Sequence, residues 1–225
     1  MSYDNDLPGY CEYLNISDFS DILMDLYNQV KSDEYNEFGK TGWHSYSLEH
    51  IDGRDSGFSE TFEPILSIMR EVHPDMQKRS TGFNTSNAAD NNLFIHTDID
   101  TDQEHPNYYN IIIPLQGDSI ISYYNSSEEE IFLGEPNAHG HGYYHEFKGR
   151  NSHDHNSDFV NERRIGSVNM NKPVLLSTGT MHGVTVQSAP RVAWCTRWIN
   201  IREEGDFKRF MADAQAAHAE RMAKG

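Results

Sequence analysis

The stretch STGTMHGVTVQSAPRVAWCTRW, residues 177–198, predicts a β-hairpin. His182 stands in a turn-like Gly-Thr-Met-His-Gly opening, and a strand rich in β-branched residues follows over 183–187. The turn Ser-Ala-Pro at 188–190 then reverses the chain, and a second strand begins at Arg191. We therefore expect the hairpin to fold Arg191 back toward the level of His182.

Side chains alternate between the two faces of that second strand. One face carries Arg191, Ala193, Cys195 and Arg197, and the other carries Val192, Trp194, Thr196 and Trp198. The aromatic face is expected to pack beneath helices, so the first face looks into a barrel. A buried guanidinium without a partner is costly. It therefore requires either an acidic residue such as Asp98 or an anionic ligand that it grips bidentately.

Other segments of the chain also read as short strands, because they are rich in β-branched or aromatic residues and bounded mostly by Gly, Pro, Asn or Ser. Together with the hairpin strands they are 42–51, 92–98, 108–117, 119–125, 173–178, 183–187 and 191–200. No helical pattern interrupts 92–125 or 173–200, so pairing is expected to be mainly antiparallel. The pattern predicts an all-β core, a β-sandwich or jelly roll, with flanking helices.

Helical periodicity occurs toward the two ends of the chain. Apolar residues recur at helical spacing over 17–31 and 58–72, and the tail 203–224 carries one apolar stripe. The chain is most simply a single domain over 1–225 with a helical N-terminal support region over 1–75. The C-terminal helix packs either on its own domain or on a second copy, so both a monomer and a homodimer remain open.

The segment 134–163 differs from its surroundings because it is polar and rich in histidine. Its histidines are His139, His141, His145, His153 and His155. The simplest interpretation is a long solvated loop. The functional alternatives are a lid over a site or a second metal site, since long ordered loops in compact domains are often functional.

Composition and charge narrow the choice of partners. The net charge of −17 repels phosphate backbones, so neither nucleic acid nor an anionic membrane is expected as a partner. Cys11 and Cys195 form neither a disulfide framework nor a CxxC motif. No secretory signal and no apolar run of about 18 residues is found, so we expect a cytoplasmic protein.

Four His-x-acid pairs could contribute to a metal site: His50–Asp52, His73–Asp75, His96–Asp98 and His218–Glu220. Residues i and i+2 point in nearly opposite directions on a helix, which excludes the pair in the C-terminal tail. The pair around Pro74 reads as a helix stop, whereas the pair at 50–52 remains possible at the end of a strand. His96–Asp98 fits best, because i and i+2 face the same way on a strand and NLFI before it predicts a stiff, buried strand.

A third ligand is expected from a neighbouring strand, and His182 is its obvious source. Two histidines, one carboxylate and open positions form the ligand pattern of non-haem Fe(II) oxygenases. His96-Thr97-Asp98, the distal His182, and Arg191 nine residues later resemble the motif of the 2-oxoglutarate/Fe(II)-dependent dioxygenases. The resemblance runs from about residue 92 to 200 and includes the strand NIIIPLQG and the lead-in PVLLSTGTMHGV.

The resemblance implies a double-stranded β-helix, a cupin-like jelly roll, as the catalytic core over 92–200. It implies that His96, Asp98 and His182 hold Fe(II), that 2-oxoglutarate is the co-substrate with its far carboxylate on Arg191, and that ascorbate supports activity. Molecular oxygen is the other reactant, and 2-oxoglutarate is decarboxylated to succinate while a substrate C–H bond is oxidised.

Two further residues are candidates for binding the co-substrate. Tyr108 and Asn110 share a strand face that is expected to look into the cavity. Family members often have a serine two residues after the arginine, where this chain has Ala193. The second donor to the far carboxylate is therefore left open.

The most direct functional prediction is a hydroxylase acting on a small polar metabolite, a free amino acid or a peptide side chain. The alternative is a cupin-like metal-binding module or isomerase without oxygen chemistry, which has no need of Arg191. A nucleic-acid demethylase is a third option, against which the net charge counts. Specificity is expected to lie in the loops 99–107 and 134–163 and in the segment KTGWHSYSLEH, residues 40–50.

Overall fold

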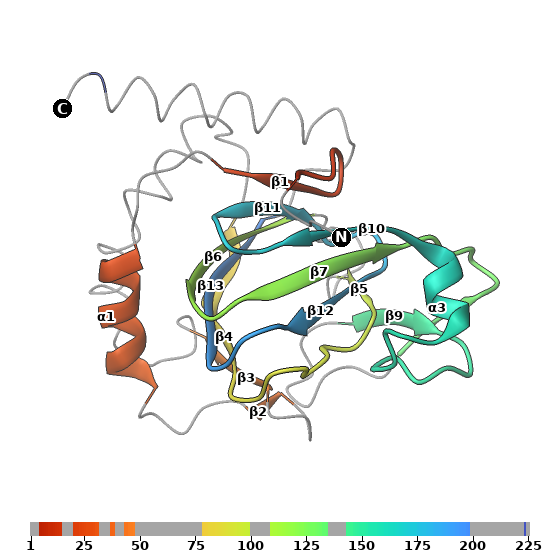
Figure 1. Cartoon of the computed structure of the whole chain (residues 1–225), viewed down its shortest axis with the longest axis horizontal. Coiled ribbons are helices and arrows are strands. Elements are labelled where there is room, and N and C mark those ends of the chain that lie inside the picture. The colour runs from red at the N-terminus through yellow and green to blue at the C-terminus, as the bar shows by residue number, and fades with distance from the viewer. Residues whose placement is uncertain are drawn as a thin grey trace.

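The computed structural model describes residues 5–14, 20–31, 37–38, 43–47, 78–99, 109–134, 143–198 and 223. Within these ranges antiparallel strands make up most of the regular secondary structure (Figure 1). The predicted helix over 58–72 lies outside the described residues, as does the predicted helix over 203–224 except for Ala223. None of the described helices is long and apolar enough to span a membrane.

A seven-stranded sheet forms one wall of the fold. In spatial order its strands are β1 (Cys11–Tyr13), β11 (Val174–Ser177), β6 (Tyr109–Gln116), β13 (Arg191–Trp198), β4 (Lys78–Ser86), β3 (Trp43–Ser47) and β2 (Glu37–Phe38). The β-branched and aromatic segments predicted as strands over 42–51, 108–117, 173–178 and 191–200 correspond to β3, β6, β11 and β13, with ends that differ by a few residues.

Two three-stranded sheets form the opposite wall. Their strands are β10 (Arg164–Asn169), β7 (Ser119–Tyr124) and β12 (His182–Val186), and β5 (Thr97–Ile99), β9 (Tyr143–Phe147) and β8 (Ile131–Leu133). Isolated bridges pair Asn92 with Thr185 and His96 with His182, so the chain before β5 lies alongside β12 and joins the two small sheets.

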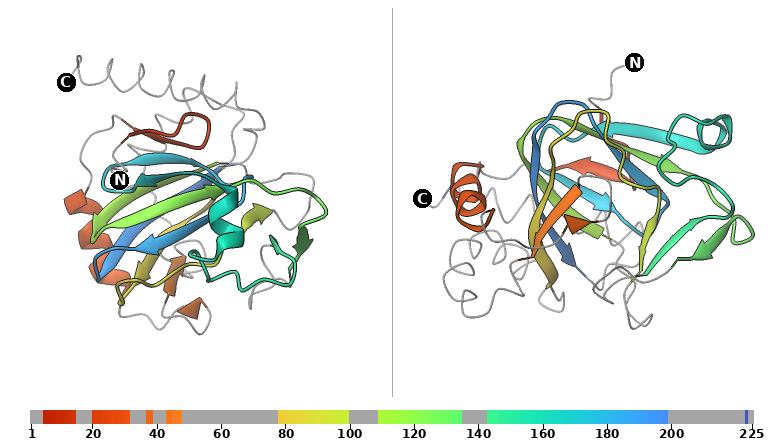
Figure 2. Two further views of the ribbon diagram at one scale, coloured as in Figure 1. Left: turned by 45° about the vertical axis from the view of Figure 1, so that its right-hand side comes forward. Right: turned by 90° about the horizontal axis from the view of Figure 1, so that it is seen from below.

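The chain crosses repeatedly from one wall to the other, as in a jelly roll. It passes from β4 in the large sheet to β5, returns to β6, and crosses again to β7. The run β10, β11, β12 and β13 alternates in the same way, so β6–β7 and β12–β13 are both hairpins between walls (Figure 2). The prediction of an all-β jelly-roll core is confirmed.

The two faces of β13 lie in different environments, as its alternation predicts. Ala193 faces the cluster of buried side chains between the walls, together with Ile112 and Val184. Trp194 on the other face is fully buried and pairs across the strands with Phe83. The ring of Tyr27 in α1 (Ser20–Val30) lies 5.5 Å from that of Phe83, so this aromatic layer lies beneath a helix.

The N-terminal region departs from the helical support that its sequence suggests over 1–75. Its described part contains α1 but also β1, β2 and β3, which extend the large sheet at both edges. The strand β4 is also absent from the prediction, because KRSTGFNTS lacks an apolar alternation. Its inward residues Asn84 and Ser86 lie beside polar groups of β13 rather than in an apolar core.

The segment 134–163 is not a plain loop where it is described. It contains β9, which pairs with β5, and α3 (Asp158–Arg163). Phe147 and Val160 from this segment form a buried cluster with Ile95, Tyr124 and Met181. The segment lies on the side of the barrel opposite α1 (Figures 1 and 2) and packs against the chain that carries the His-x-Asp pair.

Candidate metal centre

His96, Asp98 and His182 converge at one point inside the barrel. One potential ligand atom from each lies within 4.8 Å of the others, and all three residues are buried. The backbones of His96 and His182 exchange two hydrogen bonds of 2.9 and 2.8 Å, so the two histidines come from adjacent chain segments. The backbone N–H of Asp98 donates to the carbonyl of Thr178 at 2.9 Å. This bond holds β5 beside the chain segment that leads into His182.

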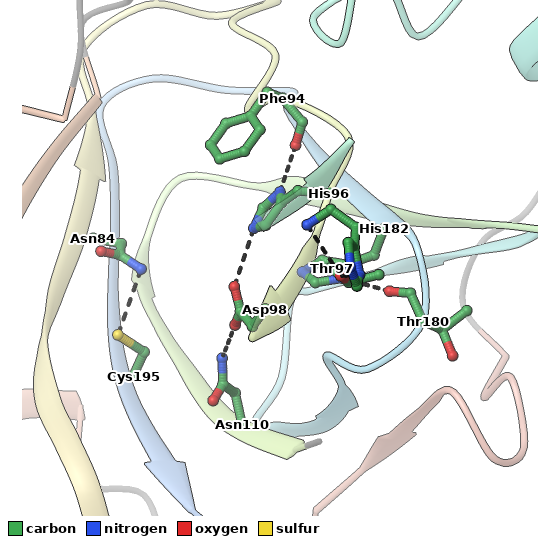
Figure 3. A network of polar contacts seen from close by, with 10 residues as sticks. Asn84, Phe94, His96, Thr97, Asp98, Asn110, Thr180, His182 and Cys195 are labelled. Carbon is green, nitrogen blue, oxygen red and sulfur yellow. Dashed lines mark hydrogen bonds and ion pairs between the residues drawn. The ribbon is translucent and has the colours of Figure 1, made fainter. Parts of the chain in front are cut away.

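Both histidines are oriented by the same device. His96 Nδ1 lies 2.7 Å from the carbonyl of Phe94, and His182 Nδ1 lies 2.8 Å from the carbonyl of Thr180 (Figure 3). A carbonyl only accepts hydrogen bonds, so each Nδ1 carries the hydrogen and donates it. When such a ring is neutral, it presents its Nε2 lone pair, the form in which histidine binds a metal.

These donors fit a divalent cation. His96 Nε2 lies 3.2 Å from Asp98 Oδ1, so in the neutral ring a lone pair faces a carboxylate oxygen. Such atoms repel unless a proton or a metal ion lies among them. Two imidazoles and one carboxylate form the facial triad of non-haem Fe(II) sites. It is the one candidate metal-binding group among the residues that the structure describes; the other three His-x-acid pairs lie outside them.

Asn110 sits next to the carboxylate of this group. Its Nδ2 donates to Asp98 Oδ2 at 3.3 Å, which leaves Oδ1 directed at His96 (Figure 3). Asn110 is therefore in contact with a member of the candidate metal-binding group, and its role in binding the co-substrate stays a prediction. Tyr108, the other residue predicted to bind the co-substrate, lies outside the described residues.

Aromatic rings enclose His96. Phe94 stacks on its imidazole with ring centroids 4.1 Å apart, and Tyr144 meets it edge-on at 5.0 Å. Tyr144 belongs to β9, directly opposite Asp98. Sequence reasoning did not single out either ring. The alternation Phe94-x-His96-x-Asp98 could have indicated Phe94, whereas Tyr144 depends on a pairing between distant segments.

Arg191 is buried in the same barrel. Its Nε donates to Ser119 Oγ at 2.9 Å and its Nη1 donates to the carbonyl of Asn84 at 3.2 Å. Burial lowers the pKa of Arg191 to about 10, which still leaves it charged at neutral pH. Asp98 is hydrogen-bonded to Asn110 instead, and no carboxylate of the described residues pairs with the guanidinium. The site therefore offers a buried positive charge to an anionic ligand.

His155 bridges the two chain segments that carry the candidate metal ligands. Its Nε2 donates to the carbonyl of Leu93 at 2.8 Å, and its Nδ1 lies 3.1 Å from Thr185 Oγ1 in β12. Burial lowers the pKa of His155 to about 4, so the ring is neutral at pH 7. The ring lies against Gly183, where an added Cβ would come within 2.7 Å of His155 Cε1.

Gly183→Ala should therefore destabilise the protein, because β12 or the His155 ring must shift to admit the methyl group. We expect the free energy of unfolding to fall by about 1–3 kcal/mol, the usual cost of overpacking. Denaturant unfolding measures it. In a His155→Ala background the same substitution should cost clearly less, and an equal cost in both backgrounds would refute the steric explanation.

Comparisons with family models and with curated protein sequences find no match. Solved structures do resemble the chain. SnoN, described as an epimerase in complex with Fe3+, alpha ketoglutarate and nogalamycin RO, superposes with a TM-score of 0.53 at 11% identity, covering 88% of this chain and 83% of its own. SnoK, a non-haem alpha ketoglutarate dependent carbocyclase from nogalamycin biosynthesis, gives 0.52 at 14%, covering 86% and 80%.

HygX from Streptomyces hygroscopicus, solved with nickel, 2-oxoglutarate and hygromycin B, gives a TM-score of 0.51 at 12% identity, covering 86% of this chain and 81% of its own. At these identities the likeness establishes the fold. The chain thus has the double-stranded β-helix architecture of 2-oxoglutarate/Fe(II)-dependent enzymes, and a buried His-Asp-His group lies inside it.

Proposed function

We propose that the protein is an Fe(II)- and 2-oxoglutarate-dependent dioxygenase that hydroxylates a small polar metabolite, a free amino acid or a peptide side chain. One observation carries the proposal: a buried two-histidine, one-carboxylate group and a buried arginine without a carboxylate partner among the described residues occupy one barrel. A metal site alone explains the first feature. The two together call for a metal ion and an anionic ligand.

The residues around this group could bind both the metal ion and the co-substrate. His96 and His182 would hold Fe(II) through Nε2 and Asp98 through Oδ1, with Asn110 fixing the second carboxylate oxygen. Arg191 would bind the far carboxylate of 2-oxoglutarate, and Phe94 and Tyr144 shield His96 from water.

Bound Fe(II) and 2-oxoglutarate would supply the oxidation, in which a substrate C–H bond, O2 and 2-oxoglutarate give the alcohol, succinate and CO2. The protein's own contribution is to orient ligands and co-substrate and to exclude water.

The competing function is a cupin-like metal-binding module or an isomerase without oxygen chemistry. Such a protein would need the metal ligands but not the buried guanidinium of Arg191, whose desolvation is unfavourable without an anion. A fold of this kind also occurs in proteins described as an epimerase and a carbocyclase, so the identity of the product tests hydroxylation separately from co-substrate use.

The test is release of succinate and CO2 from 2-oxoglutarate by the purified protein with Fe(II) and ascorbate under air. We expect slow uncoupled turnover without any added substrate, and none when Fe(II) is replaced by Ni(II). An iron-loaded protein that neither binds nor consumes 2-oxoglutarate would support the binding module instead.

A further inference from the structure

Trp43 lies in the same row of the large sheet as Arg191. Trp43 of β3 and Arg191 of β13 both pair with Ser86 of β4, one on each side. Residues directly opposite each other in antiparallel strands project from the same face of a sheet. The guanidinium carbon of Arg191 lies 5.2 Å from the centroid of the Trp43 ring, so the two side chains meet inside the barrel.

The indole N–H of Trp43 donates no hydrogen bond to any described residue. The side chain is buried, with 3% of its surface exposed, and its Nε1 has no acceptor among the described residues. A buried tryptophan N–H normally finds a partner. Leaving it unmet costs about 1–3 kcal/mol, so the position requires an explanation.

The serine side chains beside Arg191 already accept hydrogen bonds. Ser86 Oγ accepts from Asn91 Nδ2 at 2.8 Å, and Ser119 Oγ accepts from Arg191 Nε at 2.9 Å. Ala193, two residues after Arg191, has no side-chain donor at all. Trp43 Nε1 is thus a buried donor without an acceptor among the described residues, and its side chain lies in the same row as a cation that lacks a carboxylate partner among those residues.

We propose that Trp43 Nε1–H is the second donor to the far carboxylate of 2-oxoglutarate, beside Arg191. This role rests on the proposed function. Trp43 would supply the hydrogen-bond donor that the side chain of Ala193 lacks. One carboxylate has two oxygens, so it can accept from the guanidinium and from the indole together. Binding thus satisfies a buried charge and a buried N–H with a single ligand group, while the indole also contacts the guanidinium.

The experiment compares Trp43→Phe with the parent on Ni(II)-loaded protein, where binding is measured by calorimetry without turnover. Phenylalanine keeps an aromatic ring beside Arg191 but lacks the N–H, and it is smaller than the indole, so a second ligand is needed to separate the lost hydrogen bond from the lost volume. Two ligands are titrated: 2-oxoglutarate, and 2-oxopentanoate, which has the same keto-acid end but no far carboxylate. We expect the variant to bind 2-oxoglutarate about tenfold more weakly, the usual worth of a hydrogen bond to a charged group. Its affinity for 2-oxopentanoate should equal that of the parent.

Trp194→Phe is the matched control, because it removes an indole from the opposite face of the same sheet and should leave the ratio of the two affinities unchanged. Equal weakening of both ligands by Trp43→Phe, or unchanged binding of 2-oxoglutarate, would overturn the role of Trp43. Failure of the parent itself to prefer 2-oxoglutarate over 2-oxopentanoate would instead refute the proposed function and this inference with it.

Discussion

His96→Ala should lower the affinity of the protein for Fe(II) or Ni(II) by more than 100-fold. The substitution removes one of three converging ligand atoms, and even an outer partner of a metal ligand is typically worth about 10–100-fold in affinity. Anaerobic calorimetry with Fe(II), or aerobic calorimetry with Ni(II), measures the effect directly. Succinate release should disappear together with metal binding.

His153→Ala is the appropriate control for this variant. His153 lies near the same region, since its ring is 6.0 Å from that of Phe94, but it is partly exposed and its Nδ1 bonds the carbonyl of Asn92. We expect its metal affinity to stay within about threefold of the parent. If His96→Ala also bound metal at parental affinity, the ion would have to be held elsewhere.

Arg191→Met should raise the dissociation constant for 2-oxoglutarate by about 100-fold or more while leaving metal affinity intact. Removing one partner of a buried, hydrogen-bonded charge pair costs about 2–5 kcal/mol. Methionine resembles the arginine stem in volume and lacks the charge, so the loss reports on the guanidinium. Titration of the Ni(II)-loaded variant with 2-oxoglutarate gives the constant, and thermal melting shows whether the fold persists.

The ligand-free Arg191→Met variant should be no less stable than the parent, because removal of a buried charge without a carboxylate partner among the described residues offsets the loss of its hydrogen bonds to Ser119 and Asn84. Parental affinity for 2-oxoglutarate in this variant would show that the guanidinium holds something else. Together with unchanged metal binding, that result would favour the cupin-like module.

Much of the site could be predicted from sequence because its parts obey local rules. His96 and Asp98 are two residues apart on an extended segment, so they face the same way wherever that segment lies. The hairpin at 182–198 likewise places His182 and Arg191 through its turn. The central strands were recognisable because each buries β-branched residues.

Other contacts could not be predicted, because they depend on pairing between distant segments. Tyr144 contacts His96 only because β9 pairs with β5. The sequence around Tyr144 does not indicate which strand β9 pairs with. The strand β4 was not predicted because its inward side chains face a polar part of the site. Its sequence therefore lacks the apolar alternation that identifies a strand. His155 looked like part of a solvated loop, whereas its polar ring is buried between two backbone segments.

Trp43 illustrates the same limit. Its segment is recognisable as a strand, but its position beside Arg191 follows from both strands pairing with β4. The open question of the second carboxylate donor therefore had no answer within the Arg191 strand itself.

The most direct test of the account is a crystal structure of the protein grown with Fe(II) and 2-oxoglutarate without oxygen, with anomalous scattering measured at the iron edge. We predict one anomalous peak, bound by the two imidazoles and the Asp98 carboxylate, with 2-oxoglutarate running from it to Arg191. A peak at any other residues, or side chains of His96 and His182 directed away from a common point, would contradict the account.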